Sequence, residues 1–357
     1  MSVLKDSSNA AVSEQSPLLG SENELTMGNF PVLENTTLGS QVTQVRKPLP
    51  QTIGHRGFKA AAPENTMMAF KAAVDAGVEA VETDLHLTRD GVIVLCHDET
   101  LERCYGDKAK VRDLDWDEIS KFRTLREPHQ PMPRLVDLLE YLDKPGLEDI
   151  WLMLDIKTHD DAEEMMQRIA EALASVPSKR PWAERVTPCC WNVTYIKLSM
   201  KYLPDYHITH LGFSTTYARC LTDIPNISFS MLHYTLASPL GGLFLRDMKR
   251  LGIPVHVWTL NEESWMEWAI RKELSGVITD EVVLFHEVCD RMGDGQGEHA
   301  TTSKKRKRTG LKSWFLYRTV RFWGEMVLFH FLLAVFMGKD WLKHGSPRSH
   351  IRKTLKV

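Results

Sequence analysis

The sequence lacks a zinc-type cysteine pair, a long apolar run near its start and any internal repeat. Its six cysteines are scattered along 357 residues without a Cys-x-x-Cys pair. This pattern argues against a zinc site and favours a reducing compartment over a disulfide framework. Residues 1–15 have no apolar core of the kind a signal peptide needs, so we expect an intracellular protein that is not secreted.

The composition divides the chain into five parts. A hydrophobic fraction of 43% and a charged fraction of 25% are ordinary for a protein with a buried core. We expect a disordered polar tail at 1–48 and a folded domain at 49–291, followed by a polar and basic linker at 292–310. An apolar, membrane-associated segment at 311–338 and a polar basic tail at 339–357 complete the chain.

Strand and helix patterns alternate throughout the expected domain. Strands are predicted at 52–54, 78–87, 92–96, 150–156, 185–189, 207–213, 227–232, 255–259 and 276–278. Helices are predicted at 64–77, 115–122, 135–142, 161–174, 194–202, 243–251, 263–270 and 282–289. The alternation indicates parallel strands, and the size fits an α/β (β/α)8 TIM barrel with a small insertion after the second strand. A doubly wound open sheet is the alternative, but no Gly-x-Gly-x-x-Gly follows a strand.

Three carboxylates fall at the ends of two predicted strands. Glu82 and Asp84 are two residues apart, so both side chains point to the same face of their strand. Asp155 is the last residue but one of the strand at 150–156. In a barrel such positions meet at one end. Together the three residues could enclose Mg²⁺ or Ca²⁺, hard cations that prefer oxygen ligands.

Cations and histidines accompany these carboxylates. Arg56 and Lys157 follow two strands and would place positive charge where a phosphate binds. His55 and His97 also follow strands, and imidazoles can exchange protons near neutral pH. Metal, cations and paired histidines together suggest phosphodiester cleavage.

Each feature alone has a simpler explanation. A Glu-x-Asp pair is more often a solvated strand edge, and a histidine after a strand is more often a surface or capping residue. Asn65 could help to start a helix, and Trp258 could pack in the core. Their joint occurrence at strand ends favours a functional site.

Seven segments in order resemble the glycerophosphodiester phosphodiesterase family. They are Gly54-His55-Arg56-Gly57, Pro63-Glu64-Asn65-Thr66, Glu82-Thr83-Asp84, Asp90-Gly91, His97-Asp98, Val257-Trp258-Thr259-Leu260-Asn261 and Gly276-Val277-Ile278-Thr279-Asp280. The resemblance covers residues 51–290 and the motif set is highly specific. Within the family the chain is most similar to the fungal phosphatidylglycerol phospholipases C, which also carry a C-terminal apolar tail.

The resemblance implies a TIM barrel with one divalent cation and assigns roles to ten residues. They are the acid/base pair His55 and His97, the phosphate or substrate contacts Arg56, Lys157 and Trp258, the metal ligands Glu82, Asp84 and Asp155, and the supporting residues Glu64 and Asn65. The wider family usually has Glu at the third ligand position, whereas the fungal subgroup shares Asp155.

The mechanism implied by the resemblance has two steps. A hydroxyl of the glycerol head group attacks phosphorus, one histidine takes its proton and the other protonates the leaving oxygen. A cyclic phosphate forms and is then hydrolysed. Phosphatidylglycerol carries the required free hydroxyl, whereas phosphatidylethanolamine does not.

The C-terminal region suggests membrane attachment. Within 311–338 the clean apolar run covers only 326–337, which is shorter than the ~20 residues of a spanning helix. We therefore favour a helix that lies in the interface or dips in and returns. The basic run Lys304-Lys305-Arg306-Lys307-Arg308 would attract anionic lipid by about 1 kcal/mol per charge. A nuclear localisation patch, an extra helix packed on the barrel and a full span are the alternatives.

These observations together predict a membrane-associated, metal-dependent phospholipase C acting on phosphatidylglycerol, at the endoplasmic reticulum, mitochondrion or lipid droplet. A phosphodiesterase acting on soluble glycerophosphodiesters, a lysophospholipase D and a non-catalytic lipid-binding regulatory barrel are the rivals. We expect an anionic membrane surface as partner, and no nucleic acid.

Overall fold

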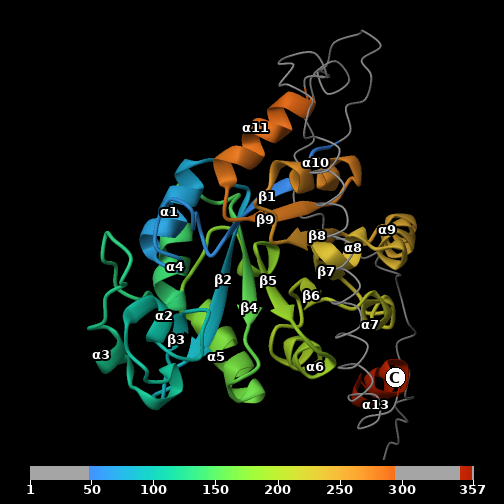
Figure 1. Ribbon diagram of the computed structural model, residues 1–357. Helices are drawn as coiled ribbons and strands as arrows, with labels where there is room; N and C mark the ends of the chain where they lie inside the picture. The colour runs from blue at the N-terminus through green and yellow to red at the C-terminus, as the bar shows by residue number, and fades with distance from the viewer. Residues whose placement is uncertain (1–47, 294–345, 356–357) are drawn as a thin grey trace, which may run out of the picture.

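Eight parallel strands form a closed barrel in the computed structural model, which describes residues 48–293 and 346–355 (Figure 1). The ring closes because β1 pairs with β9 on one side and with β2 on the other. The barrel strands are β1 (Gln51–His55), β2 (Ala80–Leu87), β4 (Trp151–Ile156), β5 (Val186–Cys190), β6 (Ile208–Gly212), β7 (Ile227–Leu232), β8 (Val255–Trp258) and β9 (Gly276–Thr279). The predicted (β/α)8 barrel is confirmed, and the open doubly wound sheet is wrong for these residues.

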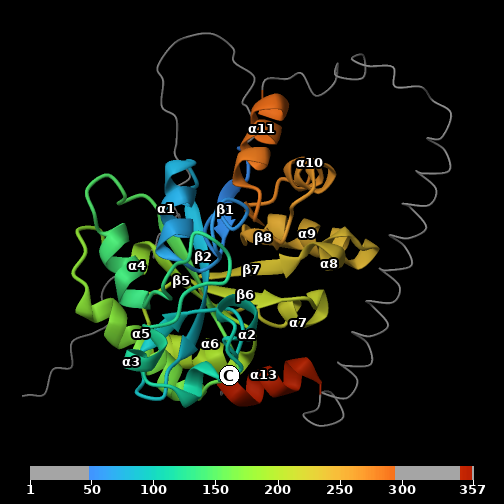
Figure 2. The same ribbon diagram turned by 60° about the vertical axis from the view of Figure 1, so that its left-hand side comes forward.

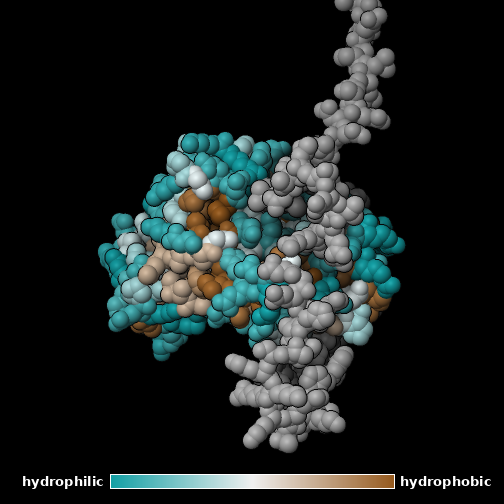
Figure 3. Space-filling model, turned by 90° about the horizontal axis from the view of Figure 1, so that it is seen from above, coloured by the Kyte–Doolittle hydropathy of each residue, from teal (hydrophilic) through white to brown (hydrophobic). Residues whose placement is uncertain are grey.

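Helices surround the barrel (Figures 1 and 2). They are α1 (Met67–Asp75), α4 (Leu135–Leu142), α5 (Ala162–Ser175), α6 (Val193–Tyr202), α7 (Thr215–Arg219), α8 (His233–Ala237), α9 (Pro239–Leu251), α10 (Glu263–Arg271) and α11 (Val282–Gly293), with a 3-10 turn η2 (Trp182–Glu184) before β5. Every residue of β2 and β4 is buried, because helices cover one face and the barrel interior covers the other. Seen from above, the outer surface is mainly hydrophilic with separate hydrophobic patches (Figure 3).

An insertion follows β2, as predicted. It contains β3 (Ile93–Leu95), which pairs antiparallel with β2, and then α2 (Glu102–Tyr105), η1 (Val111–Asp113) and α3 (Trp116–Ile119). The insertion has a small apolar core of its own, which includes Leu101, Ile119 and Met132. It therefore packs as a compact lobe at the side of the barrel.

Two predicted helix starts differ from the structure. The helix expected from residue 64 begins at Met67, because Asn65 has a left-handed backbone (φ +53°) and Thr66 is the N-cap. The helix expected from Leu243 begins at Pro239, four residues earlier. The short helices α7 and α8 were not predicted, because five residues are too few to show a helical period.

A further helix, α13 (Pro347–Leu355), lies in the region expected to be a polar tail. Its residue Ile351 is buried, and the helix packs against α6. No helix within 48–293 or 346–355 is long and apolar enough to cross a membrane. The expectations for the N-terminal tail, the basic run and the apolar segment 311–338 lie outside the described residues.

Candidate active site

Three buried carboxylates from β2 and β4 meet near the end of the barrel where β1 and β4 terminate. Asp84 and Asp155 are direct neighbours in the register of these two strands, and Glu82 lies two residues before Asp84 on the same face. One ligand oxygen from each residue lies within 4.8 Å of the others. Buried oxygen donors this close together suit a hard divalent cation.

The electrostatics of the group agree with a cation site. Burial raises the pKa of Glu82 well above its ordinary value, and the charges of Asp84 and Asp155 add to the effect. Burial also raises the pKa of Asp155. Burial alone would raise the pKa of Asp84, but Lys157 and Arg56 together hold it below its usual range. A cation bound among these oxygens would favour the ionised form of all three residues.

Lys157 and Arg56 supply positive charge at the same place. The Lys157 Nζ lies 2.6 Å from both Asp84 Oδ1 and Asp155 Oδ2. Arg56 has a left-handed backbone (φ +56°) directly after β1. This turn lets its backbone N–H donate to Glu82 Oε2 at 2.9 Å, while its guanidinium pairs with Asp84 at 3.2 Å. Both cations are therefore held by the residues that would bind the metal.

His55 is oriented by a carboxylate from the last strand of the barrel. Its Nδ1 lies 2.7 Å from Asp280 Oδ1. Asn261 fixes Asp280, because its Nδ2 donates to Asp280 Oδ2 at 2.7 Å and its Oδ1 accepts from the Asp280 N–H at 2.9 Å. Burial lowers the pKa of His55, although the bond to Asp280 opposes this shift. An Nδ1–H donated to Asp280 leaves Nε2 as the nitrogen that can exchange a proton.

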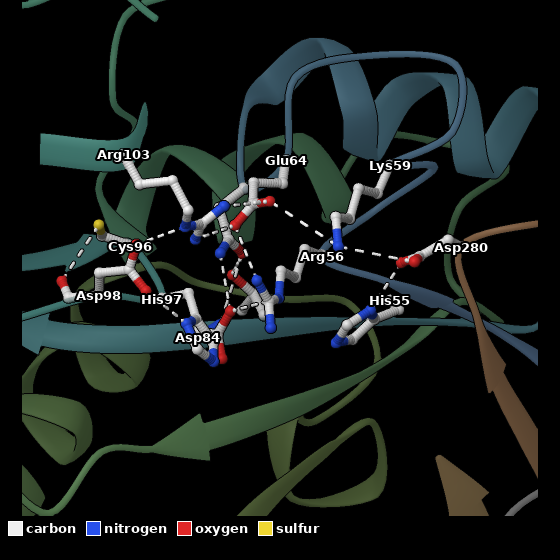
Figure 4. A network of polar contacts seen from close by, with 12 residues as sticks. His55, Arg56, Lys59, Glu64, Asp84, Cys96, His97, Asp98, Arg103 and Asp280 are labelled. Carbon is white, nitrogen blue, oxygen red and sulfur yellow. Dashed lines mark hydrogen bonds and ion pairs between the residues drawn. The ribbon is translucent and has the colours of Figure 1, made fainter. Parts of the chain in front are cut away.

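His97 has a matching arrangement on the insertion side (Figure 4). Its Nδ1 lies 2.8 Å from Asp98 Oδ1, and Arg103 Nε donates to Asp98 Oδ2 at 2.6 Å. The same Arg103 also donates to both carboxylate oxygens of Glu64, which in turn pairs with Arg56. Burial would raise the pKa of Glu64, but the two guanidinium groups lower it to about 2. One continuous network thus joins His97 to the phosphate-binding side of the site.

Asn65 supports the metal group rather than starting α1. Its Nδ2 donates to Asp84 Oδ2 at 2.8 Å, and its Oδ1 accepts from the Thr83 hydroxyl at 2.8 Å. Because Asp84 and Thr83 belong to β2, Asn65 ties the loop after β1 to the neighbouring strand. The left-handed backbone of Asn65 aims its amide into the site.

A cavity of about 140 Å³ connects these groups. Its polar side is formed by both histidines and the charged residues described above, and its apolar side by Met153, Leu211 and Ile278 with two tryptophans. Trp258 donates its indole N–H to the Ser230 carbonyl oxygen at 3.1 Å, and Trp191 donates to Asp155 Oδ1 at 2.8 Å. The cavity can therefore hold a charged group next to an apolar one.

The predicted site residues all gather here. Eight of the ten line the cavity, and Glu64 and Asn65 lie behind it in contact with Arg56 and Asp84. Sequence reasoning assigned no role to Asp280, Asn261, Asp98, Arg103 or Trp191. Asp280 was detectable, because it follows β9 directly, as Arg56 follows β1 and Lys157 follows β4. Arg103 gave no signal, because its partner Glu64 lies 39 residues earlier.

The chain matches a family model and several known proteins. The model of the glycerophosphoryl diester phosphodiesterase family matches residues 55–284. The chain belongs to this family. A glycerophosphodiester phosphodiesterase of Caldanaerobacter subterraneus is 27% identical, over 64% of this chain and 93% of the relative. One of Thermotoga maritima is 26% identical over 67% of this chain and 98% of that one, with a TM-score of 0.55.

A third relative was solved with a product. It is an Oleispira antarctica phosphodiesterase in complex with sn-glycerol-3-phosphate, with 20% identity, a TM-score of 0.58 and coverage of 68% of this chain and 97% of that one. At this identity the likeness concerns the fold alone.

Membership of the glycerophosphoryl diester phosphodiesterase family makes the chain a hydrolase acting on phosphoric diesters. Family enzymes use a divalent cation, and the buried Glu82, Asp84 and Asp155 could hold it. The predicted family is thus confirmed, while the particular fungal subgroup and the identity of the ion remain predictions.

Proposed function

We propose that this protein cleaves glycerophosphodiesters, with His55 and His97 as the acid/base pair. The observation that carries the proposal is the placement of the two histidines on one cavity with the carboxylate group, Arg56 and Lys157. Each histidine is oriented through Nδ1 by its own aspartate, so each can present Nε2 to a bound substrate. This is the geometry that general acid–base catalysis of phosphoryl transfer requires.

The residues of the site would have the following roles in catalysis. Arg56 and Lys157 bind the phosphate charge, and the two tryptophans cover an apolar part of the substrate. One histidine takes the proton of the attacking hydroxyl and the other gives a proton to the leaving oxygen. A divalent cation held by Glu82, Asp84 and Asp155 would supply Lewis-acid polarisation of the phosphoryl oxygens.

The first candidate substrates are soluble glycerophosphodiesters. The support is the family match over residues 55–284 and the glycerophosphodiester phosphodiesterases among the relatives. The small cavity also suits a head group of glycerol phosphate size better than a whole lipid. On this proposal the alcohol esterified to glycerol phosphate would leave towards the open side of the cavity.

Phosphatidylglycerol is the second candidate, cleaved in the manner of a phospholipase C to diacylglycerol and glycerol phosphate. Support comes from the apolar wall of Trp191, Trp258 and Leu211, which a diacylglycerol leaving group would contact. The basic run at 304–308 and the apolar segment at 311–338 would attach the enzyme to an anionic membrane inside the cell.

One experiment separates these candidates. The purified full chain is offered glycerophosphocholine, phosphatidylglycerol, phosphatidylethanolamine and a lysophospholipid, each with and without a chelator. Turnover of glycerophosphocholine alone supports the first candidate, and diacylglycerol released from phosphatidylglycerol but not phosphatidylethanolamine supports the second. Turnover of the lysophospholipid alone supports a lysophospholipase D, and no turnover of any of the four would overturn the proposal. His55→Ala and His97→Ala should each lower turnover on the order of 10²-fold or more.

A further inference from the structure

Helix α9 carries exposed leucines and arginines next to one another. Leu240 and Leu243 are 60% and 44% exposed and lie three residues apart, so together they form an apolar pair on the helix surface. Arg246 and Arg250 follow them at spacings of three and four residues, so all four side chains share one stripe of the helix. The opposite side of α9 carries Phe244 and Met248, which are buried against the barrel. The helix is therefore apolar on both sides near its start and basic towards its end.

The neighbouring helix α7 completes this surface. Arg219 of α7 pairs with Asp247 of α9, and Arg250 lies 3.7 Å from the same carboxylate. Between the two helices is an open cavity of about 550 Å³, lined by these residues and by Thr215 and Thr216. Three arginines face a single aspartate, so the cavity has a net positive charge. We call the exposed residues of α7 and α9 that line it, Leu240 and Leu243 included, the α7/α9 face.

The α7/α9 face is connected to the catalytic cavity through the loops that follow β6 and β7. Helix α8 follows β7 without a gap and leads into α9, and α7 begins three residues after β6. Thr235 of α8 donates its hydroxyl to the Phe213 carbonyl oxygen at 2.8 Å. The Phe213 ring lies 6.2 Å from the ring of Trp191, which forms the apolar wall of the cavity and donates to Asp155. The loops after β6 and β7 therefore connect this face with the apolar wall of the active site.

We propose that the α7/α9 face is the surface through which the barrel rests on an anionic bilayer. This proposal rests on the lipid candidate for the proposed function and specifies how the enzyme approaches such a substrate. Leu240 and Leu243 insert among the acyl chains near the interface, while Arg246 and Arg250 contact lipid phosphates. The apolar wall at Trp191 then lies beside the membrane, where a lipid can enter.

Helix α13 supports the same orientation. It packs on α6, the helix before α7 around the barrel, and Figures 1 and 2 both place it beside α7. Arg348, Arg352 and Lys353 of α13 are exposed and basic, and α13 contains no acidic residue. Only residues 339–346 separate it from the apolar segment predicted at 311–338, a reach of at most about 30 Å.

Site-specific labelling of the full chain tests the proposal. Leu243→Cys on α9 and Met68→Cys on α1 are prepared separately, because Met68 is also exposed (39%) and α1 lies on the other side of the barrel (Figure 1). Each is treated with a polar maleimide, alone and with vesicles of phosphatidylcholine or of phosphatidylcholine with phosphatidylserine. Mass spectrometry reads each labelled peptide, so the native cysteines do not interfere. We expect position 243 to be protected by the vesicles that contain phosphatidylserine and not by those of phosphatidylcholine. Position 68 should stay reactive with both.

A charge variant adds a second readout. Arg246→Gln with Arg250→Gln should weaken binding to the phosphatidylserine vesicles by about tenfold or more, since each basic residue near an anionic surface contributes roughly fivefold. Turnover of a soluble glycerophosphodiester should not change. Arg112→Gln with Arg168→Gln, on η1 and α5 outside the α7/α9 face, is the matched control and should bind like the parent chain.

Three results would overturn the proposal. Equal protection of positions 243 and 68 would mean that the face has no special part in binding. Reactivity of position 243 in membrane-bound protein would mean that it faces away from the bilayer. Protection of position 243 without vesicles would mean that another part of the chain covers α9. Phosphatidylserine is not a substrate candidate, so these results are independent of whether phosphatidylglycerol is cleaved.

Discussion

Asp280 orients His55 and opposes the fall in its pKa that burial causes. The carboxylate opposes the burial that lowers the pKa of His55, so its loss should lower that pKa further. We expect Asp280→Asn to reduce kcat about 10- to 100-fold, as loss of a histidine's orienting partner does elsewhere. The lower pKa keeps the His55 imidazole neutral down to a lower pH. The limb of the pH–rate profile that reports His55, whether acidic or basic, should therefore move to lower pH.

The measurement is kcat and kcat/KM of a soluble substrate across the pH range. Asp113→Asn, an exposed aspartate on η1, should leave both the rate and the profile unchanged. A drop in rate with no movement of either limb would show that Asp280 supports the fold but does not act on the histidine.

Glu64 links folding stability to pH. Its pKa falls from an ordinary 4.5 to about 2 in the folded protein, because Arg103 and Arg56 favour the carboxylate against the effect of burial. A depressed folded pKa means that the stabilisation is full above about pH 4.5 and is lost as pH falls towards 2. We expect Glu64→Gln to lower the free energy of unfolding by about 2 kcal/mol at neutral pH.

Urea unfolding at several pH values tests this expectation. The difference between Glu64→Gln and the parent protein should shrink below pH 4.5, whereas Glu140→Gln on the exposed side of α4 should cost little at any pH. A difference that stays constant with pH would show that Glu64 acts through packing alone.

At the scale of elements, α2 connects the insertion to catalysis. Arg103 is half exposed, yet it bridges Asp98 and Glu64 and so holds the partner of His97 in place. We expect Arg103→Met to lower kcat about tenfold with little change in KM, because the residue does not line the cavity, and to lower the melting temperature only modestly, because Glu64 keeps Arg56 as a partner. Arg103→Lys should restore part of the rate.

Arg112→Met on η1 is the matched control for Arg103, since both arginines are about half exposed in the same insertion. Kinetics with a soluble substrate and a thermal melt give the two readouts. A fall in melting temperature that accounts for the lost activity would contradict a positioning role.

The strands were more predictable than the helices and the positioning residues, for physical reasons. Parallel barrel strands are buried on both faces, so β4 stands out as an apolar run broken only by Asp155, and β7 has the bounds expected. The start of α9 was missed because Gly241 and Gly242 resemble a helix break. In the structure a Cβ at Gly241 would lie 2.3 Å from the Leu236 and Thr235 carbonyl oxygens, so glycine is required for α8 and α9 to pack.

Within the site, too, some residues were predictable from the sequence and others were not. Its central carboxylates and histidines were predictable because strand ends in a barrel converge. Asp280 meets His55 across 225 residues of sequence, and only the closure of the barrel between β1 and β9 brings them together. No local sequence pattern marks such a pair, so Asp280 could not be identified from the sequence as the partner of His55.

For the whole molecule, the two helices α11 and α13 determine how residues 294–345 can meet a membrane. Helix α11 packs against β1 and α10, and Ile351 and Leu355 of α13 pack on the outer apolar layer of the same barrel. A segment with both ends fixed to one domain must begin and end on the same side of a bilayer. The apolar segment 311–338 should therefore lie in the interface or enter and return, rather than cross once.

We expect Asp290→Cys on α11 and Ser349→Cys on α13, both exposed positions, both to be labelled without detergent by a membrane-impermeant maleimide added outside sealed vesicles. Ile351→Asp should release α13 and lower the melting temperature, because it buries a charge in the apolar layer. If position 349 reacted only after detergent while position 290 reacted at once, the segment would cross the bilayer once, and α13 could not stay docked on α6 in the membrane-bound enzyme.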